Sequence, residues 1–242
     1  MRLLISVASA LETAAALEGG ADFIDAKNPF AGAIAPVAPD VLREIRTRVG
    51  GARPITAAIG DARDEESIAT RARVYAGAGA ELVKVGLAGT TNARRTVDLI
   101  AAAVRGAAAE TASVAVVAYA DYERASSPPP AVLLQAAAGA GGRGLLIDTF
   151  DKTGLALPHF IDLSILTQIV ADAHRAGLFV ALAGKLTVED LPFVHKSGAD
   201  IVGFRGAACE GGRIGRVCAE RVRSIRCAID AVTCDELTLI PS

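Results

Sequence analysis

The chain has 242 residues, which favours one large domain, since about 100 to 200 residues per domain is usual. Its 52% hydrophobic and 21% charged residues exclude a disordered, collagen-like or coiled-coil chain. A net charge of -2 offers no positive field to nucleic acid or to an acidic membrane, so we expect small-molecule partners instead. The 25 basic residues include only five lysines, which are Lys27, Lys84, Lys152, Lys185 and Lys196.

The cysteines and apolar runs predict a cytoplasmic protein without a membrane span. All four cysteines lie within 209–234, so no disulfide framework spans the chain. The N-terminus MRLLISVASALE contains an acid and leads into a helical pattern, which indicates a first strand and not a signal peptide. The longest uncharged run, 125–142, contains three consecutive prolines. The histidines show no metal-ligand spacing, and no metal site is predicted.

Short apolar clusters alternate with alanine-rich helical stretches along the whole chain. The predicted strands lie near 2–7, 22–26, 54–59, 81–85, 113–119, 144–148, 178–183 and 200–204. The predicted helices cover 11–18, 39–49, 65–78, 93–109, 130–138, 162–176, 188–195 and 212–232. This alternation predicts an α/β fold, a single-domain (β/α)8 TIM barrel over 1–242 with 231–242 as a candidate C-terminal tail. A doubly wound open sheet is the alternative.

Glycine-rich phrases mark the predicted junctions between helices and strands. GGADFIDAK (19–27), AGAELVKVG (78–86) and SGADIVGFR (197–205) each place a helix-stopping glycine before an acid and a buried strand. The string GAGGRG (139–144) matches G-x-G-x-x-G, but it closes a helix and precedes a strand, the reverse of a dinucleotide-binding loop. We therefore interpret it as a helix stop.

Charged residues in three predicted strands indicate a site at one end of the barrel. One parity of each strand faces the helices and must be apolar, which turns Asp25, Lys27 and Lys84 inward. By the same parity Asp148 points inward, and Lys152 lies on the loop just above it. These positions lie at the carboxyl ends of the strands, where barrel enzymes place their active sites.

The inward lysines point to amine chemistry. Lysine is rarely fully buried, and this chain uses arginine for most of its cations. We therefore expect that positions 27 and 84 require an amine in particular. A guanidinium stays protonated, whereas a desolvated ammonium beside another cation loses its proton and can form a Schiff base. The alternative is that each lysine reaches solvent or forms a structural pair with Asp25.

The loops after the last two strands predict a phosphate site. AGKL (183–186) and GFRGAACEGGR (203–213) supply glycine-rich backbone where barrels commonly hold phosphate. The candidate substrate-binding residues at this mouth are Gly184, Lys185, Arg205 and Gly206, together with Asp25 and Asp121. Tight turns with a surface arginine are the alternative interpretation of the two loops.

Six blocks stand in order along nearly the whole chain: DAKNP (25–29), KVGLAG (84–89), AYAD (118–121), IDTFDK (147–152), ALAG (181–184) and DIVGFRGAACEGGR (200–213). Together they resemble the (5-formylfuran-3-yl)methyl phosphate synthase family. Carried over by matching motif, the resemblance implies catalytic roles for Lys27, Lys84, Asp148 and Lys152.

The resemblance also implies a reaction. Two molecules of glyceraldehyde 3-phosphate would condense through a lysine Schiff base into 4-(hydroxymethyl)-2-furancarboxaldehyde phosphate, with loss of phosphate and water, in methanofuran or methylofuran biosynthesis. Such a carbon-oxygen lyase needs no redox step, so no cofactor is expected. The alternatives are a Schiff-base aldolase or isomerase acting on another sugar phosphate, and a non-catalytic barrel that binds a phosphate ligand. A homo-oligomer is compatible with either.

Overall fold

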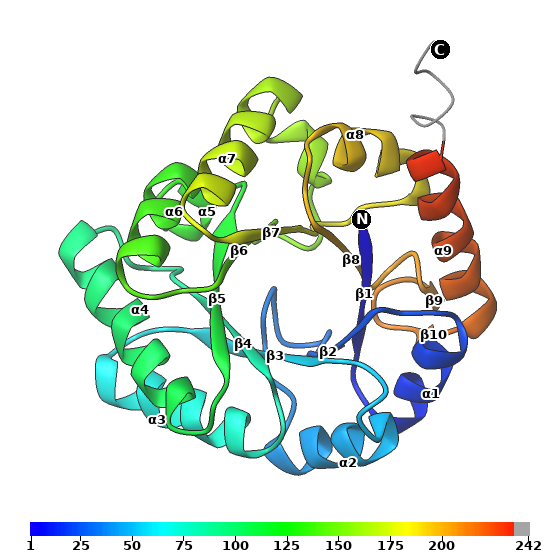
Figure 1. Cartoon of the computed structure of the whole chain (residues 1–242), viewed down its shortest axis with the longest axis horizontal. Helices are drawn as coiled ribbons and strands as arrows, with labels where there is room; N and C mark the ends of the chain where they lie inside the picture. The colour runs from blue at the N-terminus through cyan, green and yellow to red at the C-terminus, as the bar shows by residue number, and fades with distance from the viewer. Residues whose placement is uncertain (235–242) are drawn as a thin grey trace.

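The computed structural model describes residues 1–234, and its centre is a closed barrel of eight parallel strands (Figure 1). The strands are β1 (Arg2–Val7), β2 (Phe23–Ala26), β3 (Ile55–Asp61), β4 (Leu82–Gly86), β5 (Ser113–Tyr119), β6 (Gly144–Asp148), β7 (Phe179–Leu182) and β8 (Ile201–Phe204). Each pairs with its neighbours in chain order, and β8 closes on β1. The predicted (β/α)8 barrel is therefore confirmed.

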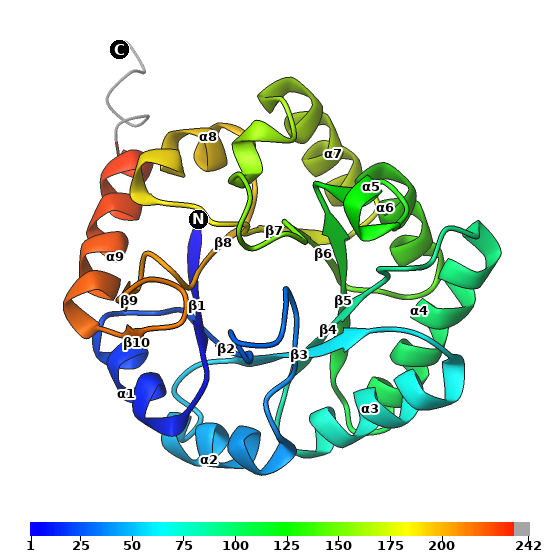
Figure 2. The same ribbon diagram turned by 180° about the vertical axis from the view of Figure 1, so that it is seen from behind.

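Helices form a ring outside the strands, as both faces of the molecule show (Figures 1 and 2). They are α1 (Ala10–Glu18), α2 (Pro39–Val49), α3 (Glu65–Gly77), α4 (Ala93–Ala108), α5 (Tyr122–Ala125), α6 (Pro130–Gly139), α7 (Leu163–Arg175), α8 (Leu191–Lys196) and α9 (Ala219–Cys234). The 3-10 helices η1 (Leu157–His159) and η2 (Val188–Asp190) precede α7 and α8. Helix α9 lies beside α1, so the end of the described chain packs against its beginning.

Local sequence signals explain where the helices begin. Ser9, Asp64 and Asn92 precede α1, α3 and α4, and each side chain accepts a hydrogen bond from a backbone N–H group of the first turn. Pro39 and Pro130 occupy the first turns of α2 and α6, where a missing N–H group costs nothing.

The main apolar core lies between the strands and the helices. Outward-facing strand residues such as Ile5, Ile24 and Val83 are fully buried in it. Close packing of the helices depends on small residues, because a Cβ atom on Gly106 of α4 would lie 2.1 Å from the carbonyl oxygen of Ala69 on α3. The helices thus pack against the outer face of the barrel, and inward-facing side chains of the strands line a cavity.

The predicted last helix, 212–232, begins too early. In the structure the chain after β8 forms a two-stranded hairpin, β9 (Cys209–Glu210) and β10 (Arg216–Val217), before α9 begins. Gly211 and Gly212 have φ values of 77° and 75°, a left-handed conformation that suits a turn and not the start of a helix. 

The candidate tail 231–242 is only partly within the described chain. Helix α9 runs to Cys234, so the first part of that range is helical, and 235–242 lies outside the described residues.

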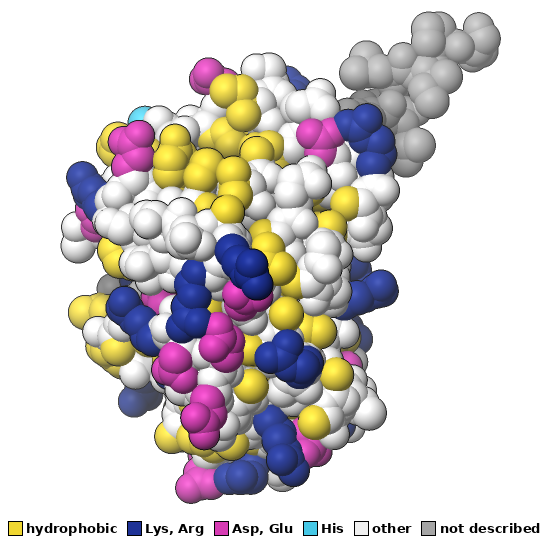
Figure 3. All heavy atoms as spheres, turned by 90° about the vertical axis from the view of Figure 1, so that its left-hand side faces the viewer, with side chains coloured by type: hydrophobic (Ala, Val, Ile, Leu, Met, Phe, Trp, Pro, Cys, Tyr) yellow, Lys and Arg dark blue, Asp and Glu magenta, His cyan; other side chains and the backbone are white. Residues whose placement is uncertain are grey.

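The flank of the barrel shown in Figure 3 carries acidic and basic side chains next to one another. Around α3 and α4, Arg73 pairs with Glu110 and Arg95 pairs with Glu65 across the helix surface. Exposed pairs of this kind contribute little stability each, but they leave no large patch of one sign on this flank. Within residues 1–234, no helix combines the length and apolarity that crossing a membrane requires.

Candidate active site

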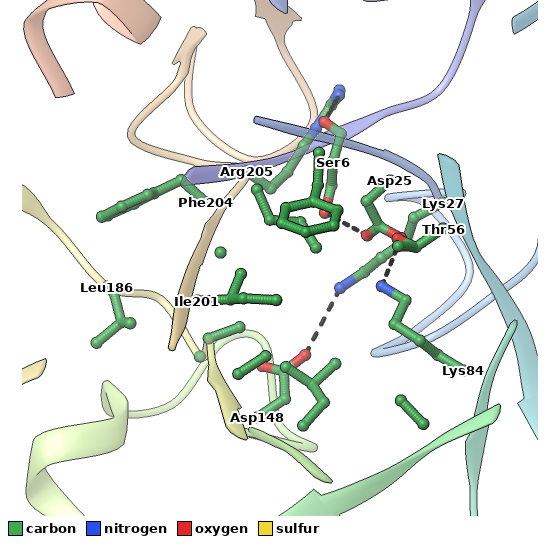
Figure 4. A pocket seen from close by; sticks show the side chains of 18 of the residues that line it. Ser6, Asp25, Lys27, Thr56, Lys84, Asp148, Leu186, Ile201, Phe204 and Arg205 are labelled. Carbon is green, nitrogen blue, oxygen red and sulfur yellow. Dashed lines mark hydrogen bonds and ion pairs between the residues drawn. The ribbon is translucent and has the colours of Figure 1, made fainter. Parts of the chain in front are cut away.

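The carboxyl ends of the barrel strands, which we call the mouth, open into a cavity of about 580 Å³. Inward-facing residues of all eight strands line it, including Lys84 and Asp148. Lys27, just after β2, and Lys152, in the loop after β6, line it as well. Figure 4 shows Lys27 and Lys84 pointing toward the middle of this cavity from neighbouring parts of the barrel. The structure therefore brings together the four residues to which the sequence assigns the chemistry.

Asp25 holds the amine of Lys84 in place. Its Oδ1 atom accepts hydrogen bonds from Thr56 Oγ1 at 2.7 Å and from Lys84 Nζ at 2.5 Å, and its Oδ2 atom accepts one from Ser6 Oγ at 2.8 Å. Burial would raise the pKa of Asp25, but the charges of Lys84 and Lys27 and these hydrogen bonds hold it below its ordinary value. Asp25 is thus an ionised partner of Lys84. Asp25 also lines the cavity, and its predicted contact with substrate stays a prediction.

Lys27 is a buried amine with a low pKa. The residue follows β2, its side chain is 8% exposed, and its Nζ atom lies 3.6 Å from Asp148 Oδ2. Burial lowers the pKa of Lys27 to about 7; the charge of Asp148 opposes this shift, and the charges of Lys152 and Lys84 add to it. Near neutral pH a large share of the molecules therefore carries an unprotonated, nucleophilic amine at Lys27.

Asp148 ends β6 with its two oxygens in different situations. Its Oδ1 atom accepts hydrogen bonds from the backbone N–H group of Thr149 at 2.8 Å and from Lys152 Nζ at 2.5 Å. Its Oδ2 atom is buried beside Lys27 and accepts no hydrogen bond from the described residues. Burial would raise the pKa of Asp148, but the charges of Lys152 and Lys27 lower it to about 2. The site thus holds a carboxylate with one oxygen available to a substrate proton.

The loops after β7 and β8 present backbone donors to the cavity. Gly184, Lys185 and Gly206 line it, and their backbone N–H groups donate to no acceptor among residues 1–234. Gly184 has a φ of 107°, and a Cβ atom there would lie 3.0 Å from Thr149 N, so only glycine lets the two loops approach this closely. The Lys185 ammonium donates to the Gly154 carbonyl, and it therefore ties its loop to the loop after β6.

Arg205 lines the cavity, and its guanidinium is fully bonded within the protein. Its Nη1 and Nη2 atoms donate to both carboxylate oxygens of Glu12, at 2.5 and 3.0 Å. The remaining guanidinium donors bond the carbonyl oxygens of Arg213, Ser6 and Gly215. All its N–H groups thus have protein acceptors, and this side chain clamps the β8 loop onto α1. Direct contact of Arg205 with substrate stays a prediction.

Asp121 supports a loop, and its predicted contact with substrate stays a prediction. Its carboxylate accepts hydrogen bonds from the backbone N–H groups of Phe150 at 2.6 Å and Asp151 at 2.9 Å. These bonds shape the segment that leads from Asp148 to Lys152. The side chain therefore acts on the site through the position of that segment.

Three residues of the site were not singled out from the sequence. Ser6 and Thr56 are polar residues on the inward face of otherwise apolar strands, a signal that could have identified them as partners of Asp25. Arg213, in the β9–β10 turn, also lines the cavity, and its Nη2 atom donates to the Gly32 carbonyl at 2.6 Å. Among residues 1–234, no group of three or more histidine, cysteine or acidic side chains is arranged to hold a metal ion.

Solved structures share the fold at low sequence identity. 3-Hexulose-6-phosphate synthase superposes with a TM-score of 0.64 at 21% identity, covering 95% of this chain and 100% of its own. A thiamine phosphate pyrophosphorylase from Pyrococcus furiosus superposes with a TM-score of 0.64 at 15% identity, covering 95% of both chains. At these identities the likeness shows the barrel fold alone.

Sequence relatives are more informative. A model of the 4-HFC-P synthase family matches residues 3–226. A Methanosarcina barkeri protein named (5-formylfuran-3-yl)methyl phosphate synthase is 36% identical over 228 residues, covering 93% of this chain and 97% of its own. A relative of the same name from Methanothermobacter thermautotrophicus is 36% identical, covering 96% of this chain and 100% of its own. Another from Methanopyrus kandleri is 40% identical, covering 87% of this chain and 90% of its own. The chain therefore belongs to the 4-HFC-P synthase family of enzymes.

Proposed function

We propose that this protein is a (5-formylfuran-3-yl)methyl phosphate synthase that condenses two molecules of glyceraldehyde 3-phosphate. The product, 4-(hydroxymethyl)-2-furancarboxaldehyde phosphate, has the atoms of two triose phosphates less one phosphoric acid and two water molecules, so the reaction needs no oxidant or reductant. It would serve methanofuran or methylofuran biosynthesis. The observation that carries the proposal is the buried Lys27 amine, with a pKa of about 7, beside Asp148 in the mouth of a barrel of this family.

Lys27 is the nucleophile in this proposal. Its neutral amine adds to the carbonyl carbon of one triose phosphate, and loss of water gives an iminium. The iminium withdraws electrons and stabilises a carbanion at the neighbouring carbon. That carbanion expels the phosphate from the next carbon and leaves an enol. Through the carbon that carried the phosphate, the enol attacks the ketone carbon of the second triose phosphate, which has isomerised to the ketone form, and the new carbon–carbon bond forms.

Asp148 and Lys152 move the protons. The free Oδ2 atom of Asp148 lies beside Lys27, where the C–H proton next to the imine carbon must be removed. Lys152 bonds the other oxygen of the same carboxylate, and its pKa is lowered by burial against the opposing charge of Asp148. It can therefore pass a proton to a departing hydroxyl or phosphate. Lys84, held on Asp25, adds positive charge that favours the neutral form of Lys27.

The phosphate groups are proposed to bind at the rim above these residues. Gly184, Lys185 and Gly206 line the cavity from the β7 and β8 loops, and their backbone N–H groups have no acceptor among residues 1–234; phosphate is a preferred acceptor for such groups. Arg213 extends from the same side and supplies a cation whose charge already acts on Lys152. Arg205 contributes by holding the β8 loop, through its bonds to Glu12.

Reductive trapping tests the assignment of the amine. Borohydride added with glyceraldehyde 3-phosphate should attach the mass of a triose phosphate to Lys27, and incubation without borohydride should produce the furan aldehyde chromophore. Lys27→Arg should lose both signals, because guanidinium cannot form the imine. Lys196→Arg, at an exposed lysine in α8, is the matched control. Full furan formation by Lys27→Arg would refute the proposed mechanism, and a different product from wild-type protein would refute the function.

A further inference from the structure

The interior of this barrel is hollow, in contrast to the usual arrangement. Inward-facing side chains of alternate strands form layers of four, and bulky branched residues normally fill them. Below the mouth, one layer consists of Ser6, Ala58, Val117 and Ala183, and the next of Asp25, Lys84, Leu146 and Gly203. The layer below that consists of Leu4, Thr56, Ala115 and Ala181. Small residues therefore predominate where a packed core is expected, and the cavity continues downward from the catalytic residues.

The two sides of this space differ in chemistry. Asp25 and Lys84 lie on the β2 and β4 side and are already paired with each other. In the layers just below the mouth, the β7 and β8 side presents the small apolar surfaces of Ala181, Ala183 and Gly203 to the cavity, and Ile201 and Phe179 lie further along the same strands. We call the space bounded by these three residues, Leu4 and Leu146 the lower chamber. A molecule held at Lys27 would meet an apolar wall here.

The backbone conformation at position 203 does not require glycine. Its φ lies outside the left-handed region, and a Cβ atom there would lie 3.4 Å from Leu4 Cδ2 and 3.5 Å from Ala183 Cβ, which are ordinary contacts. By contrast, a Cβ atom on Gly144, also on the inward face, would lie 2.3 Å from the Phe179 ring. Gly144 makes room for a neighbouring side chain. Gly203 has room for a Cβ atom in ordinary contact with its neighbours, and it lines the cavity.

The geometry points to the lower chamber as the subsite in which the six-carbon chain loses its hydroxyl groups and closes into the furan ring. This inference rests on the proposed function. Ring closure forms a C–O bond when a hydroxyl oxygen of one triose unit adds to the ketone carbon of the other. Each of the two dehydrations that follow removes a proton from carbon, breaks a C–O bond and releases the hydroxyl with a proton as water. An unpaired hydroxyl in apolar surroundings is costly, whereas an aromatic ring is not, so the chamber favours the dehydrated product over its precursors. The phosphate group stays at the mouth, where the backbone donors lie.

A variant that fills the lower chamber should lose furan formation while it keeps imine formation at Lys27. Gly203→Val adds branched apolar volume to β8 inside the chamber. Borohydride trapping of the first triose at Lys27 should stay within about twofold of wild type, while furan formation should fall at least about tenfold, since misplacement of reacting groups by 1 Å can cost a hundredfold. Gly203→Ala should show an intermediate loss. Ser113→Leu, which adds volume at the far end of the same cavity, should retain wild-type furan formation.

The outcomes distinguish this inference from the proposed function. Unaltered furan formation by Gly203→Val would overturn the chamber inference alone, as would an equal loss of trapping and furan formation. Ala181→Val tests the same wall from β7 and should reproduce the selective loss, so the result does not depend on the folding of one variant. If wild-type protein forms no furan from glyceraldehyde 3-phosphate, the proposed function fails and this inference fails with it.

Discussion

The pH dependence of imine formation tests the environment of Lys27 most directly. Its pKa of about 7 lies below the ordinary lysine value of 10.5 because the amine is buried and two further ammonium groups, those of Lys152 and Lys84, lie nearby. A shift of this size corresponds to a factor of roughly 3,000 in the protonation equilibrium. At pH 7 about half of the Lys27 amines are then neutral, against roughly one in 3,000 for an ordinary lysine.

The assay is single-turnover trapping with borohydride, followed by mass measurement of the peptide that contains Lys27. Only the neutral amine adds to a carbonyl, so the initial rate should rise about tenfold per pH unit below 7 and level off above it. A rate that keeps rising to pH 10 would show that Lys27 titrates as an ordinary lysine and would refute this account of the site. Trapping at another lysine with the same profile would assign the low pKa to the wrong residue.

Three further perturbations have defined outcomes. Asp148→Asn removes the negative charge that raises the pKa of Lys27, so the midpoint of the trapping profile should move below 7, and an upward shift would contradict the assigned charges. Glu12→Ala leaves the Arg205 guanidinium buried without its carboxylate and should destabilise the fold by about 3–5 kcal/mol in urea denaturation; a change near zero would show that the clamp is dispensable. Gly106→Ala places a methyl group against the α3 backbone and should cost about 1–3 kcal/mol in the same assay, whereas Gly139→Ala, with no atom within 4 Å of its Cβ position, should not destabilise.

The alternation of side chains within each strand predicts which charged residues point into the barrel. Outward positions must be apolar to pack against the helices, so the charged residues at Asp25, Lys27, Lys84 and Asp148 could only point inward. This rule is local, because it depends on the period of two in a strand. The lysine scarcity of the chain adds the chemical information that an amine is required there.

The hydrogen-bond partners of Arg205 and Asp121 could not be predicted from strand alternation. Arg205 lies in the loop that the sequence associates with phosphate, but its partner Glu12 is 193 residues earlier in the chain. Asp121 bonds backbone groups 29 and 30 residues later. Whether a charged side chain at the mouth has a free donor or acceptor depends on which loops reach it, and that follows from closure of the barrel.

The sequence by itself determined the βα alternation, the barrel and the inward direction of its acids and lysines, because these follow from local periodicity and from burial on one face. Only the tertiary structure decided that the Lys27 amine is desolvated beside Asp148, and that the layers beneath it are too small to fill the barrel. Both depend on which residues from distant strands meet around the barrel axis, and no single strand contains that information.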